Sequence, residues 1–474
     1  MKKIIKLEII LSLITFVLLL IIAFNTNITG DSGDSITHYL YSHYAFKYPH
    51  FFLHHWAKPF FVFCSATFSQ FGFKGIIVFN CICATLSALF SFYIAKNLKI
   101  KHSWLVFIFI FFAPLYFKLI FSGLTEYLFG LFLVIGIHLI IKSKYIYAAI
   151  IISFLPLIRS EGLLIVGVFG LYYLFQKKYK DIPYLLFGQL IYTAVGAFYY
   201  KDILWVVNKI PYANMGSPYG SGELLDFVHR LNYVIEKPIY LLLVIGSISL
   251  VYSLFRYGLK ENNDVKVILI LGSFISLFIA HSIFWWLGIL NSMGLPRVLN
   301  AVVPLIAIIS LIGVQFITSR VQNPIIKYSL LCGISLLICF YPFSNRPQGV
   351  VFDNQLFVIE ENLLITEKVV PYIEKQFPDY STSTVYFSHP YLSLALNIDY
   401  FDIDKHREMQ TLLIDNVEPG AIIIWDDWFS VIQGRVDLEQ LTNDSRFELM
   451  QTFQQKEDNR MIQYTVFKTI ATTE

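Results

Sequence analysis

Residues 298–317 read VLNAVVPLIAIISLIGVQFI and contain no Asp, Glu, Lys or Arg. A helix of about 20 mostly apolar residues is long enough to cross the hydrocarbon core of a bilayer. Comparable or somewhat shorter apolar segments recur along the first three quarters of the chain, at 8–24, 75–95, 104–119, 126–141, 145–158, 162–175, 183–200, 238–255, 267–287 and 325–343. The pattern predicts a polytopic α-helical membrane protein with about eleven spans.

The composition agrees with this fold class. Of the 474 residues 56% are hydrophobic and only 15% are charged, whereas soluble proteins carry about 25% charged residues. This excludes an ordinary soluble enzyme and a disordered or fibrous protein. The five cysteines all stand in or beside apolar segments, so they indicate neither a disulfide framework nor a zinc site.

The charges divide the chain into two parts. Residues 1–344 carry 26 Lys and Arg against 12 Asp and Glu, whereas residues 345–474 carry 10 against 21. We therefore expect a membrane domain over 1–345 and a water-soluble acidic domain over 346–474, which is long enough to bury its own core. The basic excess is spread over short loops and forms no patch, so we expect no nucleic-acid partner.

The positive-inside rule orients the chain. If the N-terminus is cytoplasmic, 16 cations fall in the short inner loops and nine in the much longer outer loops. The basic start, Met1 to Lys6, lacks a small-residue cleavage site after its apolar run, and we interpret it as part of a retained first span. The long loops 25–74 and 201–237 and the C-terminal domain are then extracytoplasmic.

The C-terminal domain is predicted to be α/β. Segment 356–376 has helical periodicity, and Ser383–Ser388 and Ala421–Trp425 are typical of short buried strands. Phe447–Phe453 and Met461–Phe467 alternate and predict a terminal hairpin.

The first outer loop contains two acidic residues directly after the first span. Asp31 and Asp34 stand in the stretch Gly30-Asp31-Ser32-Gly33-Asp34-Ser35. A carboxylate at a dry membrane edge can take a proton from a hydroxyl, and a pair of carboxylates can hold a divalent cation, here with His38 nearby. The same residues also favour an Asx-turn or a helix N-cap, and the two interpretations stay open at this point.

Histidines are concentrated in the same loop, at 38, 43, 50, 54 and 55. A metal site is one interpretation, but the spacing matches no known ligand pattern. Interfacial helices rich in His, Tyr and Trp have the same composition.

Three further groups of charged residues stand at the predicted outer ends of spans. Glu126 opens the fourth span, and Arg159-Ser160-Glu161-Gly162 lies between the fifth and sixth. Arg159 either pairs with Glu161 or meets an anionic ligand. Arg297, in Gly294-Leu295-Pro296-Arg297, opens the tenth span. An Arg is unfavourable against the helix dipole there, so it either snorkels to headgroups or binds a phosphate together with the helix amides.

These motifs, in this order, resemble the GT-C superfamily of membrane glycosyltransferases. The likeness is to the bacterial relatives of protein O-mannosyltransferases and to the lipid A aminoarabinose transferase. It rests on Asp34 followed by His54-His55-Trp56-Ala57-Lys58-Pro59, on Arg159-Ser160-Glu161-Gly162, and on Gly294-Leu295-Pro296-Arg297 through Pro304. It covers residues 1–345. Asp34-Ser35 replaces the frequent Asp-Glu, and Phe60 replaces a second proline, which leaves open which aspartate acts and whether a metal takes part.

The resemblance implies a donor sugar linked through phosphate to a polyprenyl lipid. It implies transfer to a hydroxyl of a glycan, lipid or protein on the extracytoplasmic face of a bacterial inner membrane, with inversion. Asp34 would deprotonate the acceptor, and Asp31 is the other candidate base. The phosphate would lie near Arg297, with Arg159 or Lys58; His54, His55, Glu126 and Glu161 complete the expected substrate site. No cofactor is expected with certainty, although a divalent cation is one option.

Two other functions fit some of the same features. A transporter or flippase of lipid-linked saccharides would also use cations to hold a phosphate, but such proteins often show inverted repeats, which this chain does not. A non-catalytic scaffold would use its outer domain to bind a partner, for example through the aromatic residues of Trp425-Asp426-Asp427-Trp428.

Overall fold

The computed structural model describes residues 6–211, 216–217, 219–260, 262–346, 349–412, 417–457 and 460–470. The chain forms two compact units. The helical unit comprises residues up to Gly30 and Tyr41–Leu356, and the α/β unit comprises Asp31–Leu40 and Phe357–Glu474. A short segment from the front of the chain therefore belongs to the same unit as the C-terminal residues.

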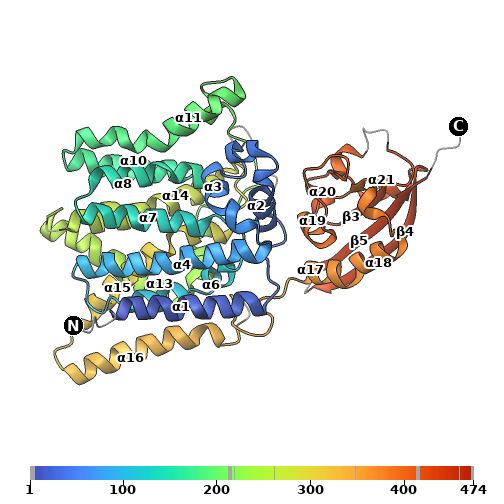
Figure 1. Cartoon of the computed structure of the whole chain (residues 1–474). Helices are drawn as coiled ribbons and strands as arrows, with labels where there is room; N and C mark the ends of the chain where they lie inside the picture. Colours follow the sequence, from blue (N-terminus) through green and yellow to red (C-terminus); the bar gives the residue numbers. More distant parts are fainter. Residues whose placement is uncertain are drawn as a thin grey trace, which may run out of the picture. The chain divides into compact units, whose positions relative to one another are not determined.

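The helical unit is a bundle of helices that run side by side (Figure 1). Its longer α-helices are α1 (Leu7–Asn25), α3 (Pro59–Ser69), α4 (Phe73–Asn97), α7 (Glu126–Ile141), α8 (Tyr145–Ser153), α10 (Gly162–Phe175), α11 (Phe187–Tyr200), α13 (Asp226–Tyr257), α14 (Gly272–Leu287), α15 (Val303–Thr318) and α16 (Pro324–Phe340). Shorter α-helices are α5 (Leu105–Phe111), α6 (Pro114–Ile120), α9 (Leu155–Ile158) and α12 (Trp205–Asn208). Turns of 3-10 helix are η1 (Tyr44–Phe46), η2 (Pro49–Leu53), η3 (Tyr179–Leu186), η5 (Pro296–Val302) and η6 (Tyr341–Phe343), and η4 (Val265–Leu271) is a π-helix.

The polytopic membrane fold is confirmed at the level of its helices. Seven helical segments within the described residues are long and apolar enough to cross a bilayer, and four apolar helices are shorter. Each of the eleven predicted segments coincides with helix. Segment 104–119, however, is not one continuous helix, because it breaks between α5 and α6 directly before Pro114, and proline cannot continue a preceding helix without losing a hydrogen bond.

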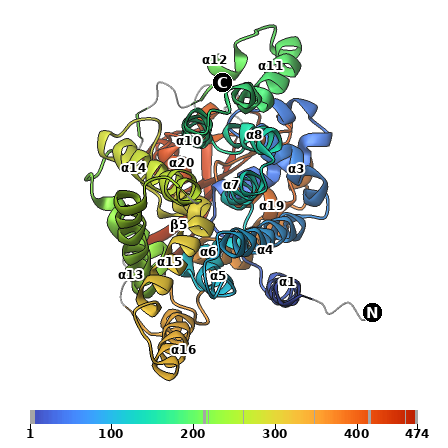
Figure 2. The ribbon, with the colours of Figure 1, turned by 90° about the vertical axis from the view of Figure 1, so that its left-hand side faces the viewer.

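The bundle has a buried centre and a lipid-facing edge. In α4 and α15, 72% and 78% of the most apolar window is buried, against 22% in α1 and 11% in α16. Viewed along the bundle, α1, α11 and α16 lie at its edge (Figure 2). α13 and α15 approach closely, since a Cβ added at Gly246 would lie 1.9 Å from the Ile309 carbonyl oxygen. Small residues are what allow membrane helices to pack this tightly.

The α/β unit is built on a five-stranded mixed sheet. The strands β1 (Val385–Tyr386), β2 (His406–Arg407), β3 (Ile422–Asp426), β4 (Phe447–Glu457) and β5 (Arg460–Thr469) stand in the order β2-β1-β3-β5-β4. β1 pairs in parallel with β2 and β3, and β5 runs antiparallel to β3 and β4. Two apolar clusters form the core, one around Ile422 and Ile424 and the other around Ile423 and Trp425, because alternate residues of β3 face opposite sides of the sheet.

Helix α2 (Asp34–His43) begins in the segment Asp31–Leu40 of the α/β unit, and its last three residues are counted in the helical unit. The other helices of the α/β unit are α17 (Glu360–Leu364), η7 (Ile365–Val369), α18 (Val370–Gln376), η8 (Tyr380–Thr382), α19 (Pro390–Leu396), η9 (Met409–Thr411), α20 (Phe429–Ile432) and α21 (Leu438–Thr442) among the described residues. The predicted helix over 356–376 is confirmed from Glu360 on, and η7 is a π-helical turn within it. The predicted strands and terminal hairpin are confirmed. The two-residue strand β2 was not predicted, because its sequence has no alternating pattern.

Candidate active site

A buried ion-pair network in the helical unit is centred on Arg159, which caps α9 at the turn into α10. Its Nη1 lies 2.7 Å from Glu126 Oε1, at the start of α7, and its Nε donates to Glu161 Oε1 at 2.5 Å. Nη1 also donates to the Thr125 hydroxyl at 3.0 Å. The guanidinium thus joins two segments that are distant in sequence, and pairing with Glu161, one of the two predicted alternatives, is present.

The charges in this network stabilise one another. Burial alone would lower the pKa of Arg159, but the carboxylates of Glu126 and Glu161 outweigh it and the pKa is raised. Burial would likewise raise the pKa of Glu161, yet Arg159 and His281 hold it well below its usual range. His281 Nε2 stands 3.6 Å from Glu161 Oε1. Arg159 and Glu161 are therefore both ionised at neutral pH.

One oxygen of the network has no hydrogen-bond partner among the residues that the structure describes. Glu126 is 1% exposed, and within the described part of the chain its Oε2 accepts no hydrogen bond. A buried carboxylate oxygen without a donor costs free energy. It therefore marks a place where a ligand hydroxyl or a water would be stabilised.

Two more cations belong to this end of the bundle. Lys58 Nζ donates to Ser160 Oγ at 3.1 Å, which places it beside the Arg159-Ser160-Glu161 turn. Arg297, at the start of η5, acts electrostatically on Arg159, because its charge opposes the protonated form of that guanidinium. The predicted residues Lys58, Glu126, Arg159, Glu161 and Arg297 are thus brought together in one region of the helical unit.

Asn300 is a residue of this region that we did not predict as part of the site. It follows Arg297 by one turn, in η5, and is 1% exposed. Neither its Oδ1 nor its Nδ2 has a hydrogen-bond partner among the described residues. η5 packs against α7, since a Cβ added at Gly130 would lie 3.1 Å from the Ala301 carbonyl oxygen. The signal in the sequence was an amide in an otherwise apolar run.

His54 and His55 pack as neutral aromatic rings. The His54 ring stacks on Tyr41 at 4.6 Å, and its Nδ1 accepts from the Ala57 amide. His55 meets the ring of Trp205 edge-on at 5.3 Å. Burial lowers the pKa of each to about 4, aided by the charge of Lys58. At neutral pH they add no positive charge to the site, and substrate contact by either residue stays a prediction.

The two candidate aspartates lie in the α/β unit. Asp31 Oδ1 accepts hydrogen bonds from the Gly33 and Ser35 amides, so it caps the turn into α2, as one of the two predicted alternatives had it. Asp34 is the first residue of α2, and His38 lies one turn later. Over the described residues, no three or more His, Cys, Asp or Glu side chains are grouped so as to hold a metal ion. A divalent cation at Asp31, Asp34 and His38 remains a prediction.

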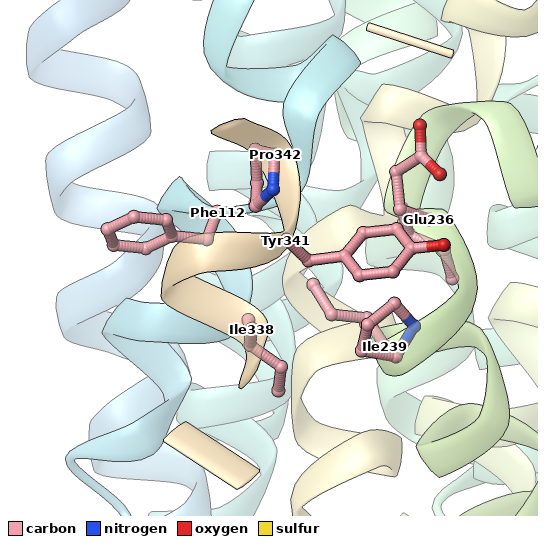
Figure 3. A pocket seen from close by; sticks show the side chains of 8 residues that line it. Phe112, Glu236, Ile239, Ile338, Tyr341 and Pro342 are labelled. Atoms are coloured by element: carbon pink, nitrogen blue, oxygen red, sulfur yellow. The ribbon is translucent and has the colours of Figure 1, made fainter. Parts of the chain in front are cut away.

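A shallow apolar pocket lies in the helical unit beside a kink in α13 (Figure 3). Glu236 leaves helical geometry there, with a φ of 61°, two residues before Pro238. Its carboxylate pairs with Arg346, which follows η6. The pocket is lined mainly by apolar side chains, namely Phe112, Ile235, Pro238, Ile239, Ile338, Tyr341 and Pro342, together with Glu236.

The fold of this chain is similar to that of a protein of known structure. A search of solved structures finds similarity to the crystal structure of ArnT from Cupriavidus metallidurans bound to undecaprenyl phosphate. The TM-score is 0.59, with 9% sequence identity, and the match covers 96% of this chain and 97% of that one. The predicted GT-C fold is therefore confirmed. A scan against protein-family models and a search of curated proteins found no match.

Proposed function

We propose that the chain is an inverting glycosyltransferase that moves a sugar from a polyprenyl-phosphate-linked donor to an acceptor hydroxyl. One observation carries the proposal. The bundle, whose fold is that of ArnT, gathers Lys58, Arg159 and Arg297 at one end. Beside them lie Glu126 Oε2 and the Asn300 amide, which have no hydrogen-bond partner among the described residues. Undecaprenyl phosphate, bound by ArnT, is a ligand of the expected chemistry.

The cations suit a phosphate leaving group. When the bond between the anomeric carbon and the phosphate oxygen breaks, negative charge grows on the phosphate. Guanidinium and ammonium groups already in place stabilise that charge without reorganising. Arg159 pairs with Glu126 and Glu161. We assign the main phosphate contact to Arg297, which stands at the start of η5, with Lys58 beside it. Glu126 Oε2 and the Asn300 amide are left to bind sugar hydroxyls.

Asp34 is the proposed base. It takes the proton of the acceptor hydroxyl while the oxygen attacks the anomeric carbon, and polyprenyl phosphate departs from the opposite face, which inverts the configuration. Asp31 is the weaker candidate, because its Oδ1 already accepts two amide hydrogen bonds.

The sidedness follows from the distribution of cations. We place the N-terminus in the cytoplasm and the C-terminal α/β unit outside a bacterial inner membrane. Nucleotide sugars are cytoplasmic, so an outward-facing transferase needs a donor carried by a lipid. The lipid chain would lie against the bundle, and the apolar pocket beside the α13 kink offers a surface of suitable chemistry. The acceptor is a glycan, a lipid or a protein.

The test is incubation of the purified protein in detergent with a panel of polyprenyl-phosphate sugars. We expect release of polyprenyl phosphate that depends on Asp34 and Arg297. The same protein in vesicles distinguishes a transporter, which would move the intact lipid between leaflets and cleave nothing. Movement without cleavage would overturn the proposal.

A further inference from the structure

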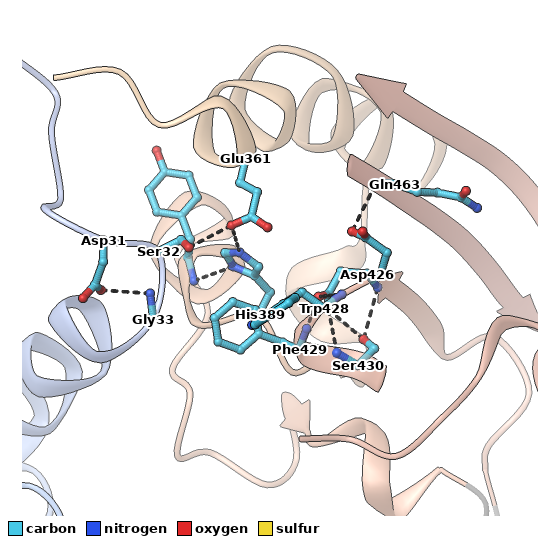
Figure 4. Close-up of polar contacts among 12 residues, drawn as sticks. Asp31, Ser32, Gly33, Glu361, His389, Asp426, Trp428, Phe429, Ser430 and Gln463 are labelled. Atoms are coloured by element: carbon cyan, nitrogen blue, oxygen red, sulfur yellow. Dashed lines mark hydrogen bonds and ion pairs between the residues drawn. The ribbon is translucent and has the colours of Figure 1, made fainter. Parts of the chain in front are cut away.

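A network of polar contacts in the α/β unit connects the segment Asp31–Leu40 to the C-terminal residues (Figure 4). The Ser32 hydroxyl donates to Glu361 Oε2 at 2.8 Å. These two residues are 329 positions apart in the sequence. Glu361 is the second residue of α17, and its side chain is 11% exposed. Ser32 stands two residues before Asp34, the proposed base.

Glu361 is itself held on two sides. Its Oε2 faces His389 Nε2 at 3.6 Å, and its Oε1 faces Arg460 Nη2 at 3.5 Å. Arg460 also contacts Asp427 at 3.0 Å. Burial would raise the pKa of Glu361, but His389, Ser32 and Arg460 together lower it. The carboxylate is therefore ionised at neutral pH, and a hydrogen bond to an ionised acceptor is stronger than one between neutral groups.

The Nε2 atom of His389 faces Glu361. It caps α19, where its Nδ1 accepts from the Tyr391 amide at 3.2 Å. In the neutral ring the proton then belongs to Nε2, which points toward Glu361. The side chain is fully buried, and Nε2 has no hydrogen-bond partner within 3.5 Å in the described part of the chain. Asp426 and Tyr464 are the other ionisable groups nearby.

Packing supports the same attachment. A Cβ added at Gly33 would lie 3.1 Å from Phe429 Cζ, so the backbone of the segment passes directly over that ring. Phe429 in turn meets the His389 ring edge-on at 4.5 Å. The Asp426 carboxylate fixes Phe429 by accepting from the backbone amides at the start of α20. The Ser32–Glu361 hydrogen bond and the close Gly33–Phe429 contact therefore both hold the segment.

We propose that Glu361, oriented by His389 and Arg460, is a positioning residue that holds the Asp31–Leu40 segment through Ser32 and so fixes the Asp34 carboxylate on the α/β unit. This inference rests on the proposed function only in giving Asp34 its role as base. The α/β unit then contributes to the reaction through Glu361, which positions Asp34 and does not itself touch the substrate.

Hydrogen–deuterium exchange of the full-length protein tests the attachment without any substrate. We expect Ser32→Ala and Glu361→Ala each to speed exchange of the amides between Gly33 and Thr37 by about tenfold, the scale set by a hydrogen bond to a charged group. Ser32→Thr, which keeps the hydroxyl, should restore slow exchange. Ser393→Ala is the matched control, because it removes another buried serine hydroxyl of the same unit, one bonded to the Ile398 carbonyl oxygen. Unchanged exchange in both Ser32→Ala and Glu361→Ala would overturn the proposal.

Transfer kinetics test the consequence. Ser32→Ala should lower kcat by about tenfold and leave the donor KM within about twofold, because a displaced base slows chemistry more than donor binding. Ser393→Ala should keep the wild-type kcat. Equal losses of kcat in Ser32→Ala and Ser393→Ala would show a general structural effect on the unit and would contradict a positioning role for Glu361. If exchange is faster in the Ser32→Ala and Glu361→Ala variants but the wild-type protein transfers no sugar, the proposed function is refuted and the attachment of the segment is supported.

Discussion

Arg159 Nη1 lies 2.7 Å from Glu126 Oε1, and the two side chains are only 15% and 1% exposed. The pair connects the start of α7 to the turn between α9 and α10, and Glu161 completes it. Removing one member of such a network leaves an uncompensated charge in a dry environment.

We therefore expect Arg159→Ala to destabilise the protein by about 3–5 kcal/mol, in addition to any loss of transfer. Thermal unfolding in detergent measures this. Arg256→Ala is the control, because Arg256 is exposed and contacts mainly Tyr252; its melting temperature should match the wild type. A fully stable Arg159→Ala protein would show that Glu126 and Glu161 are neutral or solvated.

Replacing Asn300, in contrast to Arg159, should not destabilise the protein. Because its buried amide has no partner among the described residues, Asn300→Leu removes a desolvation cost of about 1–3 kcal/mol. We expect equal or greater thermal stability together with a loss of transfer activity. Asn300→Leu with full activity would exclude the amide from the substrate site.

Asp34→Asn should lower the rate of transfer by about 10²–10⁴-fold, which is the contribution of a general base. Asp31→Asn keeps an acceptor oxygen for the Gly33 and Ser35 amides and should change the rate by less than about tenfold. The two variants are compared at saturating donor after correct folding is verified. The reverse order of the two losses would make Asp31 the base.

Arg297→Ala should chiefly weaken use of the donor. Loss of a charge-assisted contact to phosphate corresponds to a rise in donor KM of about 10–100-fold. The donor KM of Arg297→Lys should lie between those of the wild type and of Arg297→Ala, since lysine keeps the charge but not the bidentate geometry. Arg320→Ala serves as the control, because Arg320 is exposed and its guanidinium bonds only the Phe316 carbonyl oxygen among the contacts described. Unaltered donor KM in Arg297→Ala would remove Arg297 from the phosphate site.

The attachment of the Asp31–Leu40 segment should depend on pH. The pKa of Glu361 is below its ordinary value of 4.5 in the folded protein, although burial opposes this, because His389 and Ser32 favour the ionised form. Ionised Glu361 therefore stabilises the folded protein above pH 4.5, and the contribution is lost as the pH falls through the lowered pKa. Exchange of the Gly33–Thr37 amides, corrected for intrinsic rates, should accelerate on acidification in the wild type. In Glu361→Gln the corrected exchange rate should not depend on pH below pH 5. A corrected rate that is equally independent of pH in the wild type would contradict the role of ionised Glu361 in holding the segment.

The sequence predicts what depends on local composition. Each apolar segment coincides with helix, because spanning length is a property of the segment itself. Pro114 is a signal for the helix break, but the residues on both sides of it are apolar, so the segment was predicted as continuous. The pairing of Arg159 with Glu161 could also be read, since the two are neighbours.

Contacts between distant residues could not be predicted. The position of Glu126 beside Arg159 depends on how α7 packs against the α9–α10 turn. The contact of Ser32 with Glu361 depends on a fold in which the front of the chain joins its end. A single sequence contains no signal for either, because each residue is compatible with an exposed loop.

The membership of Asp31–Leu40 in the α/β unit also has a consequence for biosynthesis. Ser32 is made early, whereas Glu361 follows 329 residues later, and β5 ends only at Thr469. While the intervening helices insert into the bilayer, the segment has no partner to dock on. A ribosome adds about 5–20 residues per second, so the segment waits for tens of seconds. The segment can therefore dock only after the residues of the α/β unit have been made, and a chain that terminates before Glu361 would lack the partner of Ser32.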